Sequence, residues 1–453
     1  MNTIEELANA PWPELIRRAR ESGPQFVLRY LKMLRRQWLP QEQIRRYQER
    51  RLERILRHAL KRVPAYREAP GTKVSVMRGE GLRVLDQFPL MDRWTLVEQW
   101  ERFVARNARR YSPKLVRTGG TTGKPVSLYL DGRTRALWNM AALLRRLWAG
   151  WKPGDRSVLF WQPYGDRPAT YDVNTPHALD RSERELFLNA ARLDDRRLRE
   201  YVHLVVSFRP QFLRGFPSVL ILLTRALNSL RARLRLRAVL TGGELLGDEQ
   251  RHYLEETFAC KVYDHYNMWE NVAYAPQCEH GSYHLIPELS HVEILRNGQP
   301  CQPGEVGEIV GTHLGNYAMP LIRYNMNDLA SPNQAPCRCG RGTQTFTLIG
   351  GRGRDIIVTP RGYVVVPTIL LWTSILPPHS VEKLQFYQER KDEVLVRIVR
   401  GNGYTEDDTR RLIAEIDQIF DGAVTLRWEY VEEIPRTPSG KYPYVVSHVP
   451  LEL

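Results

Sequence analysis

The stretch LVRTGGTTGKPVSLYL at residues 115–130 constrains the fold more than any other part of the sequence. Two alternating apolar runs enclose a short loop of glycines, threonines and one lysine. The loop residues are Thr118, Gly119, Gly120, Thr121, Thr122, Gly123 and Lys124. Backbone N–H groups of a glycine-rich loop can converge on phosphate oxygens, and the hydroxyls and the lysine add further donors. The pattern therefore predicts a hairpin that carries a phosphate-binding loop.

This loop differs from the Walker A loop of nucleotide-hydrolysing proteins. Thr118 stands at the position of the first Walker glycine, and Pro125 follows the lysine where a Ser or Thr would bind Mg2+. An ordinary hairpin turn is the alternative, but it needs only two special residues, whereas seven stand here in succession. We therefore expect a phosphate-binding loop of another class.

From about residue 110 onward, the chain alternates apolar strand-like runs with helical patterns. Strands are expected at 157–161, 236–243 and 260–267, and this alternation is typical of a mostly parallel sheet covered by helices. In such open sheets ligands bind at the carboxyl edge, where glycine-rich loops follow the strands. The segment from residue 301 to residue 330 predicts an additional β-rich section.

The motif IGGRGRD at residues 349–355 is typical of a hinge and divides the chain into two predicted domains. An N-terminal domain covers residues 1–350, with a helical lead-in over about 1–70, and a lid domain covers 351–453. Strand patterns at DIIV, EVLVRIV and VTLRWEYV and a helical pattern at 405–420 make the lid α+β. The predicted fold class is α/β: a large domain with mostly parallel sheets flanked by helices plus the β-rich section, and a small α+β C-terminal lid.

Composition excludes several classes of protein. With 42% hydrophobic and 26% charged residues in 453, the chain is expected to fold and to be neither collagen-like nor largely disordered. Five cysteines are an odd number and the Met1 region lacks an apolar secretory segment, so we expect a reducing, cytoplasmic location. The apolar window at 363–376 is shorter than the ~20 residues of a membrane span, and no transmembrane helix is expected.

The N-terminal segment is strongly basic. Net charge is +15, and residues 1–67 hold 16 Lys or Arg against 7 acids. Such an arm suits polyanions, so nucleic acid and an anionic membrane surface are possible partners. Apolar residues from Leu31 to Leu60 recur at helical spacing, however, which favours packed amphipathic helices with a solvated basic face. We expect no specific nucleic-acid partner, and a monomer or homodimer.

Two short cysteine-rich loops predict a metal site. CEHGSYH begins at Cys278, and CRCG contains Cys337 and Cys339. Together with one histidine these thiols can converge as a Cys3His tetrahedron for structural zinc. His284 is the favoured fourth ligand because it begins a strand, and His280 is the rival. Reduced surface cysteines that hold no ion remain the alternative.

Six motifs, in order, resemble those of adenylate-forming enzymes, the superfamily of acyl-CoA synthetases, peptide-synthetase adenylation domains and luciferases. They are TGGTTGKP, LTGGELL with Glu244, DHYNMWE ending at Glu270, MPLIRYNMNDLA with Asp328, GRGRD with Arg352, and RTPSGK ending at Lys441. The chain looks most similar to the phenylacetate-CoA ligase group and its capsule-biosynthesis-associated branch, which share the LRHALKRVPAYRE lead-in and the GEIV strand. The resemblance extends over about residues 50–446, and the zinc pattern also occurs in similar branches.

The resemblance implies ATP, Mg2+ and, as acceptor, CoA. Acyl adenylation brings a carboxylate to the α-phosphate of ATP, so charge neutralisation is the catalytic problem. By resemblance, Lys441 bridges these two anions, Glu270 holds Mg2+ and Thr121 assists catalysis. Tyr266 is expected to stack on adenine, and Asp328 to accept the ribose hydroxyls. The full set implied to bind the nucleotide is Thr118, Gly119, Gly120, Thr121, Thr122, Gly123, Lys124, Gly243, Glu244, Tyr266, Asn267, Asp328 and Arg352.

Two positions depart from the family pattern. Asn267 stands where the family usually has Gly, and Arg354 stands where it often has Asp. Asn tolerates left-handed backbone angles better than most residues, so the turn can survive. We expect Asn267 to affect how the acyl group fits, and Arg354 to affect the behaviour of the hinge.

The expected function is ATP-dependent activation of a carboxylic acid as acyl-AMP, with transfer of the acyl group to CoA. The resemblance suggests an aryl or arylacetic acid, and the candidates to line its pocket are aromatic: Trp138, Trp148, Trp161, Tyr164 and Trp269. Alternatives on the same fold are transfer of AMP or of the acyl group to a hydroxyl or an amine. A non-catalytic polyanion-binding protein is a more distant alternative, because every charged catalytic candidate is present.

Overall fold

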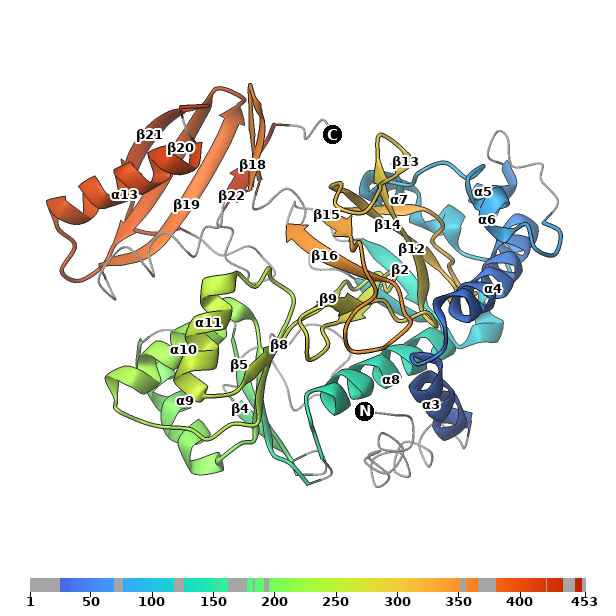
Figure 1. Ribbon diagram of the computed structural model, residues 1–453. Coiled ribbons are helices and arrows are strands. Elements are labelled where there is room, and N and C mark those ends of the chain that lie inside the picture. The colour runs from blue at the N-terminus through green and yellow to red at the C-terminus, as the bar shows by residue number, and fades with distance from the viewer. Residues whose placement is uncertain are drawn as a thin grey trace.

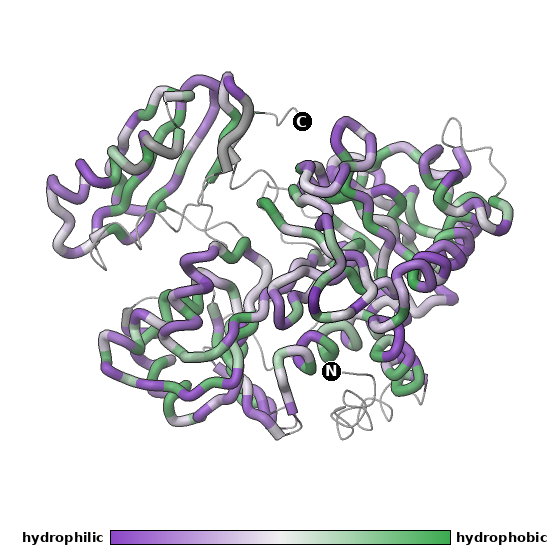
Figure 2. The backbone as a smooth tube through the Cα atoms, in the orientation of Figure 1, coloured by the Kyte–Doolittle hydropathy of each residue, from purple (hydrophilic) through white to green (hydrophobic). Residues whose placement is uncertain are grey.

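The computed structural model describes residues 25–68, 76–117, 126–152, 154–161, 177–181, 184–190, 195–350, 356–365, 380–420, 422–434 and 445–449. Figure 1 shows the arrangement of the elements, and Figure 2 shows how hydrophobic residues are distributed along the chain. Three predicted features fall outside these ranges: the phosphate loop at 118–124, the hinge at 352–355 and the loop that ends at Lys441.

Helices form the N-terminal part of the described chain, as predicted. They are α3 (Gln25–Arg36), α4 (Gln41–Arg62), α5 (Pro64–Glu68), α6 (Gly81–Leu85) and α7 (Arg93–Gln99), followed by the 3-10 turns η1 (Trp100–Phe103) and η2 (Ala108–Tyr111). Helix α4 ends at Arg62 because Pro64 disfavours a helical conformation in the residue before it, and Val63 is extended. Its apolar side buries Leu52, Ile55 and Leu56, so the lead-in is packed against the rest of the molecule.

The predicted mostly parallel sheet is confirmed as a six-stranded sheet. In spatial order its strands are β4 (His177–Asp180), β5 (Glu185–Asn189), β3 (Ser157–Trp161), β6 (Phe212–Gly215), β7 (Ala238–Thr241) and β8 (Lys261–Tyr263). All neighbours pair in parallel except β4, which runs antiparallel to β5. The helices that cover the sheet are α8 (Gly132–Trp148), α9 (Asp195–Phe208), α10 (Pro217–Ser229) and α11 (Asp248–Phe258).

Alternation of side chains along the strands divides the core between the two faces of this sheet. Leu213 and Val239 belong to the hydrophobic cluster that includes residues of α9, α10 and α11. Their neighbours Phe212 and Leu240 belong to a second cluster that includes α3 and α8. Successive side chains of a strand point to opposite faces, so α8 covers the face opposite to the other three helices. Figure 1 shows α9, α10 and α11 grouped on one side.

The β-rich section is a second six-stranded sheet, and its strands are antiparallel. In spatial order they are β11 (Tyr283–His284), β16 (Thr345–Gly350), β15 (Tyr324–Pro332), β14 (Gly307–His313), β12 (Ser290–Arg296) and β13 (Gln299–Pro300). Two antiparallel hairpins stand apart: β1 (Lys114–Arg117) with β2 (Ser127–Leu130), and β9 (His265–Asn267) with β10 (Tyr274–Pro276). The first confirms the hairpin predicted to carry the phosphate loop.

The C-terminal section has its own core, consistent with an α+β unit. Its elements are β17 (Ile356–Thr359), β18 (Gly362–Val365), β19 (Val381–Arg390), β20 (Glu393–Arg400), α13 (Glu406–Phe420), β21 (Thr425–Tyr430) and β22 (Val445–Ser447). Helix α13 buries Leu412, Ile416 and Phe420 against Phe386 and Ile398 of the four-stranded sheet. None of the described helices combines the length and apolar composition of a membrane span.

Candidate functional site

Two of the predicted nucleotide-binding motifs meet in the folded chain. The hydroxyl of Tyr266 in β9 donates to the Oδ2 atom of Asp328 in β15, and it also lies 3.3 Å from the sulfur of Met326. Both Tyr266 and Asp328 are buried. Residues expected to contact adenine and ribose therefore lie beside each other although 62 positions separate them in the chain.

The loop after β7 approaches the same region. Gly243 has a φ angle of +81°, and a Cβ atom there would lie 2.7 Å from the ring of Phe216, so only glycine fits. Gly242 packs against the ring and backbone of His265, which directly precedes Tyr266. Glu244 follows at the carboxyl edge of the parallel sheet. This is the edge where open α/β sheets bind ligands.

Glu270 carries an unsatisfied carboxylate oxygen. Its side chain is 1% exposed, and the hydroxyl of Tyr324 lies 3.3 Å from Oε1. Oε2 is buried and has no hydrogen-bond partner among the residues that the structure describes. The ring Nε2 of His313 lies 2.7 Å from the Glu270 carbonyl oxygen and holds its backbone. A buried carboxylate oxygen without a donor suits a hard cation, so the residue fits a Mg2+ ligand.

Sequence reasoning missed Asp264 and His265, which lie next to Tyr266. Asp264 is buried, accepts hydrogen bonds from Thr241 Oγ1 at 2.6 Å and from Tyr283 Oη at 2.5 Å, and burial raises the pKa of its carboxyl. Burial lowers the pKa of His265, whose Nδ1 lies 2.8 Å from the Thr241 carbonyl oxygen. The two residues tie the end of β7 to β9. Both residues open the DHYNMWE motif, and that position could have indicated their role.

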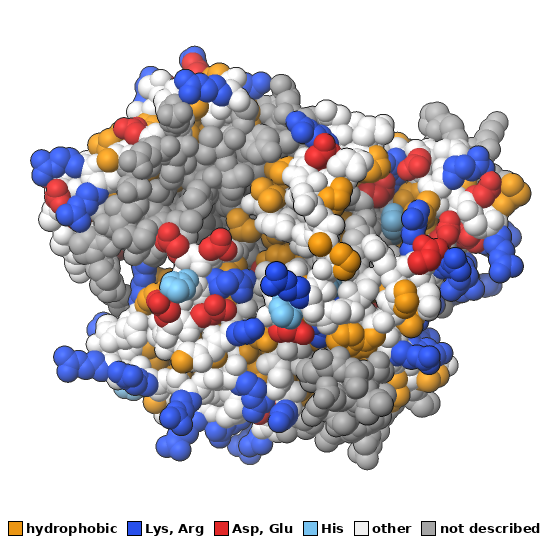
Figure 3. All heavy atoms as spheres, in the orientation of Figure 1, with side chains coloured by type: hydrophobic (Ala, Val, Ile, Leu, Met, Phe, Trp, Pro, Cys, Tyr) orange, Lys and Arg blue, Asp and Glu red, His pale blue; other side chains and the backbone are white. Residues whose placement is uncertain are grey.

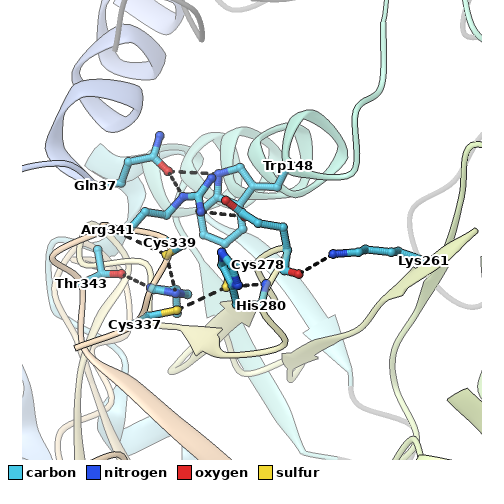
Figure 4. A network of polar contacts seen from close by, with 11 residues as sticks. Gln37, Trp148, Lys261, Cys278, His280, Cys337, Cys339, Arg341 and Thr343 are labelled. Carbon is cyan, nitrogen blue, oxygen red and sulfur yellow. Dashed lines mark hydrogen bonds and ion pairs between the residues drawn. The ribbon is translucent and has the colours of Figure 1, made fainter. Parts of the chain in front are cut away.

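The predicted metal ligands converge. The ligand atoms of Cys278, His284, Cys337 and Cys339 all lie within 4.8 Å of one another. The sulfurs of Cys278 and Cys337 are 3.6 Å apart, and the Cys339 sulfur is 3.3 Å from Nε2 of His284. His280, the rival ligand, contributes only its backbone N–H, 3.4 Å from the Cys278 sulfur (Figure 4). Geometry therefore favours His284 over His280.

The donor set fits zinc. Three thiols and one imidazole in a tetrahedral cluster are typical of structural zinc sites. Hydrogen bonds from Cys278 and from His284 lower the pKa of the Cys339 thiol, which favours a thiolate. Nδ1 of His284 lies 2.9 Å from Thr343 Oγ1, a contact that fixes the ring with Nε2 toward the sulfurs. Sequence reasoning missed this role of Thr343.

Arg341 joins the four residues Cys278, His284, Cys337 and Cys339 to the N-terminal helices. We call these four residues the metal cluster, after the ion that they are expected to bind. The Arg341 guanidinium lies over the rings of Trp38 and Trp148, 4.8 and 4.2 Å from their centroids, and Nε donates to Gln37 Oε1 at 3.0 Å. An ion pair of 2.9 Å links it to Glu279, the residue after Cys278 (Figure 4). Trp148, predicted for the acyl pocket, lies instead against this arginine and edge-on to His284.

The other aromatic candidates are spread out. The ring of Trp138 packs edge-on against Tyr274 with centroids 4.9 Å apart, and Tyr274 also contacts His265. Trp269 is 42% exposed. The side chain of Trp161 and the whole of Tyr164 lie outside the described residues. Among the described candidates, Trp138 is thus the one that lies near His265 and Tyr266, through its contact with Tyr274.

Known proteins resemble this chain in its C-terminal part and over most of its length. Residues 357–448 match the family model of the CapK C-terminal domain. Phenylacetate-coenzyme A ligase of Thermus thermophilus is 26% identical over 366 residues, which cover 78% of this chain and 80% of that protein. Protein CapK of Staphylococcus aureus is 24% identical over 272 residues, 58% of this chain and 59% of that protein.

A solved structure with the same fold is 2-hydroxyisobutyryl-CoA ligase in the postadenylation state in complex with 2-HIB-AMP. It superposes with a TM-score of 0.71 over 91% of each chain at 17% identity. The chain is therefore similar in sequence to the phenylacetate-CoA ligases over most of its length, matches the CapK C-terminal domain at residues 357–448 and has the fold of the acyl-CoA ligases.

Proposed function

We propose that this chain is an adenylate-forming ligase that activates a carboxylic acid with ATP as acyl-AMP and then transfers the acyl group to CoA. The observation that carries the proposal is the contact between Tyr266 and Asp328 beside the carboxyl edge of the parallel sheet. The resemblance assigns adenine and ribose to these two residues. Homology to enzymes named phenylacetate-CoA ligase supports the same reaction class.

In the proposed site the loop, the lysine and the glutamate would offset the negative charge of the phosphates and of the substrate carboxylate. The loop from Thr118 to Lys124 would bind phosphate oxygens, Thr121 of this loop would assist catalysis, and Lys441 would bridge the carboxylate and the α-phosphate. Glu270 would hold Mg2+ through the oxygen that has no donor among the described residues. Gly243, Glu244 and Asn267 would border the adenine. Arg352 would mark the hinge between residues 1–350 and the lid at 351–453.

The contact of Tyr266 with Asp328 has a positioning role in this proposal. A tyrosine hydroxyl that donates to a carboxylate fixes the orientation of that carboxylate and leaves its remaining lone pairs for other donors. The two ribose hydroxyls are such donors. Because both residues are buried, water competes little for the carboxylate, and its hydrogen bonds gain strength.

For the acid we propose the aryl or arylacetic class, which agrees with the names of the homologous ligases. Trp138 and Tyr274 supply aromatic surface near His265, at the end of β9 that leads into Tyr266. Transfer to a hydroxyl or an amine acceptor in place of CoA is the second candidate. It keeps the same first half-reaction and differs only in the acceptor.

A screen of carboxylic acids for pyrophosphate release, with and without CoA, tests the proposal. We expect release with an aryl or arylacetic acid, and consumption of thiol only when CoA is present. Glu270→Gln and Lys441→Ala should each reduce release by about a hundredfold or more, because each removes one charge that acts on the transition state. Glu42→Gln, an exposed residue of α4 outside these motifs, is the control and should retain activity. Release within threefold of wild type for Lys441→Ala would contradict the assignment.

We also propose that the four-residue cluster binds one structural zinc ion per chain. Purified protein that has not met a chelator should contain zinc, and Cys337→Ser or His284→Ala should lose it. Cys260→Ser and Cys301→Ser are matched controls, because these thiols lie outside the cluster. His280→Ala separates the rival assignments and should retain zinc. Metal content that falls in His280→Ala and stays in His284→Ala would reverse the choice of ligand.

A further inference from the structure

The amino edge of the parallel sheet, opposite to the candidate nucleotide site, carries a row of cationic side chains. Strand register places Arg184, Arg156 and Arg237 in that row, since each directly precedes the strand that begins at Glu185, Ser157 or Ala238. Backbone contacts agree, because Ser157 N–H donates to the Arg184 carbonyl and Arg237 N–H donates to the Gln211 carbonyl. Strands lie about 4.8 Å apart, so the three spacings from β5 to β7 spread these charges over ~14 Å.

The connection from α10 to β7 adds a second line of arginines to this edge. Residues 230–237 read LRARLRLR, and Arg231, Arg233, Arg235 and Arg237 are all exposed. The intervening Ala232, Leu234 and Leu236 are partly buried and pack on the α9–α11 side of the sheet. Alternation along this segment thus leaves the side chains of Arg231, Arg233 and Arg235 in solvent, whereas the Arg237 guanidinium donates to the Gly150 carbonyl and pairs with Asp155.

We name the ten cations of this edge the basic rim: Lys152, Arg156, Arg181, Arg184, Arg209, Arg231, Arg233, Arg235, Arg237 and Lys261. Asp155 and Asp180 are the acids that adjoin the arginines of β3, β4 and β5, and Glu255 and Glu279 lie beside Lys261 at the β8 end of the edge. Asp155 is already paired with Arg237. Arg231, Arg233 and Arg235 have no acidic partner in the part of the chain that the structure describes. Figure 3 shows blue side chains gathered along the lower edge of the region labelled α9, β4 and β5 in Figure 1, with few red ones.

Apolar side chains accompany the rim. Leu230 is 43% exposed directly before Arg231, and Leu179 is 50% exposed in β4, two residues before Arg181. The exposed aromatic residues of the described chain, Trp94, Trp269 and Tyr430, belong to other segments, so the rim offers no platform on which bases could stack. Cations beside exposed leucines match a surface of anionic lipid, whose headgroups attract arginine and whose acyl boundary accepts leucine.

We propose that the basic rim docks the protein on an anionic membrane surface. The rim lies at the edge where the strands begin, whereas Gly243 and Glu244 follow the carboxyl end of β7. A membrane bound at the amino edge therefore leaves the candidate nucleotide site open to solvent. The docking is peripheral and electrostatic, so salt should weaken it.

Co-sedimentation with lipid vesicles tests the proposal. The full chain should bind vesicles of phosphatidylcholine mixed with phosphatidylglycerol, and should not bind vesicles of phosphatidylcholine alone. Each cation near an anionic surface contributes about fivefold in affinity, so the triple variant Arg231→Gln, Arg233→Gln, Arg235→Gln should bind about a hundredfold more weakly. Its rate of pyrophosphate release should be unchanged.

A second triple variant separates the rim from overall charge. Arg45→Gln, Arg50→Gln, Arg54→Gln removes the same charge from exposed positions of α4 and should bind vesicles as the wild type does. Equal loss in both triple variants, or no loss in the rim variant, would overturn the proposal.

Binding of duplex DNA tests whether the partner of the basic rim is a lipid surface or a nucleic acid. Leu230→Ser should weaken vesicle binding and leave DNA binding at low salt unchanged, because leucine contributes only at the acyl boundary. If DNA bound more tightly than vesicles at physiological salt, and the rim variant lost that binding, the rim would be a nucleic-acid surface and the membrane assignment would be wrong.

Discussion

Replacement of Arg341 tests how the metal cluster and the N-terminal helices are joined. The side chain is 2% exposed, donates to Gln37 Oε1 at 3.0 Å and pairs with Glu279 at 2.9 Å. Removal of one partner from a buried ion pair costs about 3–5 kcal/mol, and Glu279 is partly solvated, so the lower end applies. Arg341→Met keeps most of the aliphatic stem between the two tryptophans. We expect a loss of about 3 kcal/mol.

Hydrogen exchange of the α3 amides is the appropriate assay. The described chain has four separate hydrophobic clusters, so a single unfolding transition is not expected for the whole protein. Local opening of α3 reports the junction directly, because Gln37 follows this helix and its carbonyl accepts from Gly342 N–H at 2.8 Å. The free energy of α3 opening should fall by about 3 kcal/mol in Arg341→Met.

Arg397 provides the matched control. It also pairs with a glutamate, Glu429, at 3.0 Å and lies over an aromatic ring, that of Tyr387. The Arg397 and Glu429 side chains are 31% and 47% exposed, so this pair contributes at most about 1 kcal/mol. If Arg341→Met lowered the opening free energy of α3 by less than about 1 kcal/mol, burial would not be the property that makes this arginine important.

Three further predictions concern single residues. Burial lowers the pKa of His313 to about 4, so the unfolded chain binds a proton before the folded chain does as pH falls below ~6.5. The free energy of unfolding should therefore drop by about 3 kcal/mol toward pH 4, and His313→Gln should reduce the pH dependence of thermal unfolding. Gly342→Ala should lower the unfolding temperature, because a Cβ atom there overlaps the Leu39 carbonyl, whereas Gly132→Ala meets nothing closer than 3.6 Å and should be neutral. Tyr266→Phe should weaken AMP binding about tenfold in calorimetry while the fold is retained, because Asp328 loses a donor.

Much of the fold could be predicted because its signals are local. The helical spacing of Leu52, Ile55 and Leu56 predicted α4, and the structure buries all three. Apolar runs that alternate with helical patterns predicted a parallel sheet, whose strands β3 and β7 lie where the sequence placed them. The antiparallel direction of β4 escaped prediction, since the segment between β3 and β4 contains no periodic pattern that fixes direction.

Other contacts were beyond reach because they join distant segments. The hydrogen bond from Arg341 to Gln37 spans 304 positions, and neither residue belongs to a recognisable motif. Spacing within CEHGSYH left His280 and His284 as alternatives. The fold decides between them, because Nε2 of His284 lies 3.3 Å from the Cys339 sulfur, whereas His280 reaches the Cys278 sulfur only through its backbone N–H. Side chains alternate along β11, so His284 faces the sulfurs and Tyr283 the opposite side.

The same alternation connects the metal cluster to the nucleotide side. Tyr283 precedes His284 in β11, points the other way and donates to Asp264 at 2.5 Å. Its ring stacks on Phe346 at 5.6 Å between centroids, and Phe346 packs edge-on against Tyr266 at 5.9 Å. A two-residue strand thus has one side chain in the metal cluster and the other in the packing behind Tyr266.

Loss of the proposed zinc ion should therefore reach the nucleotide side through Tyr283. Without an ion the three thiols and His284 lose their common centre. The two-residue strand β11 is then held by two register pairs with β16 and by one bridge from Tyr283 to Gln277, so we expect the ring of Tyr283 to shift. We expect chelator-treated protein to bind AMP more weakly before it unfolds, as followed by calorimetry beside circular dichroism. Tyr283→Phe keeps the ring and removes the bond to Asp264, so part of that weakening should already be present in its metal-loaded form. Unchanged AMP affinity after complete removal of zinc would show that β11 holds its place without the ion and that the two sites are independent.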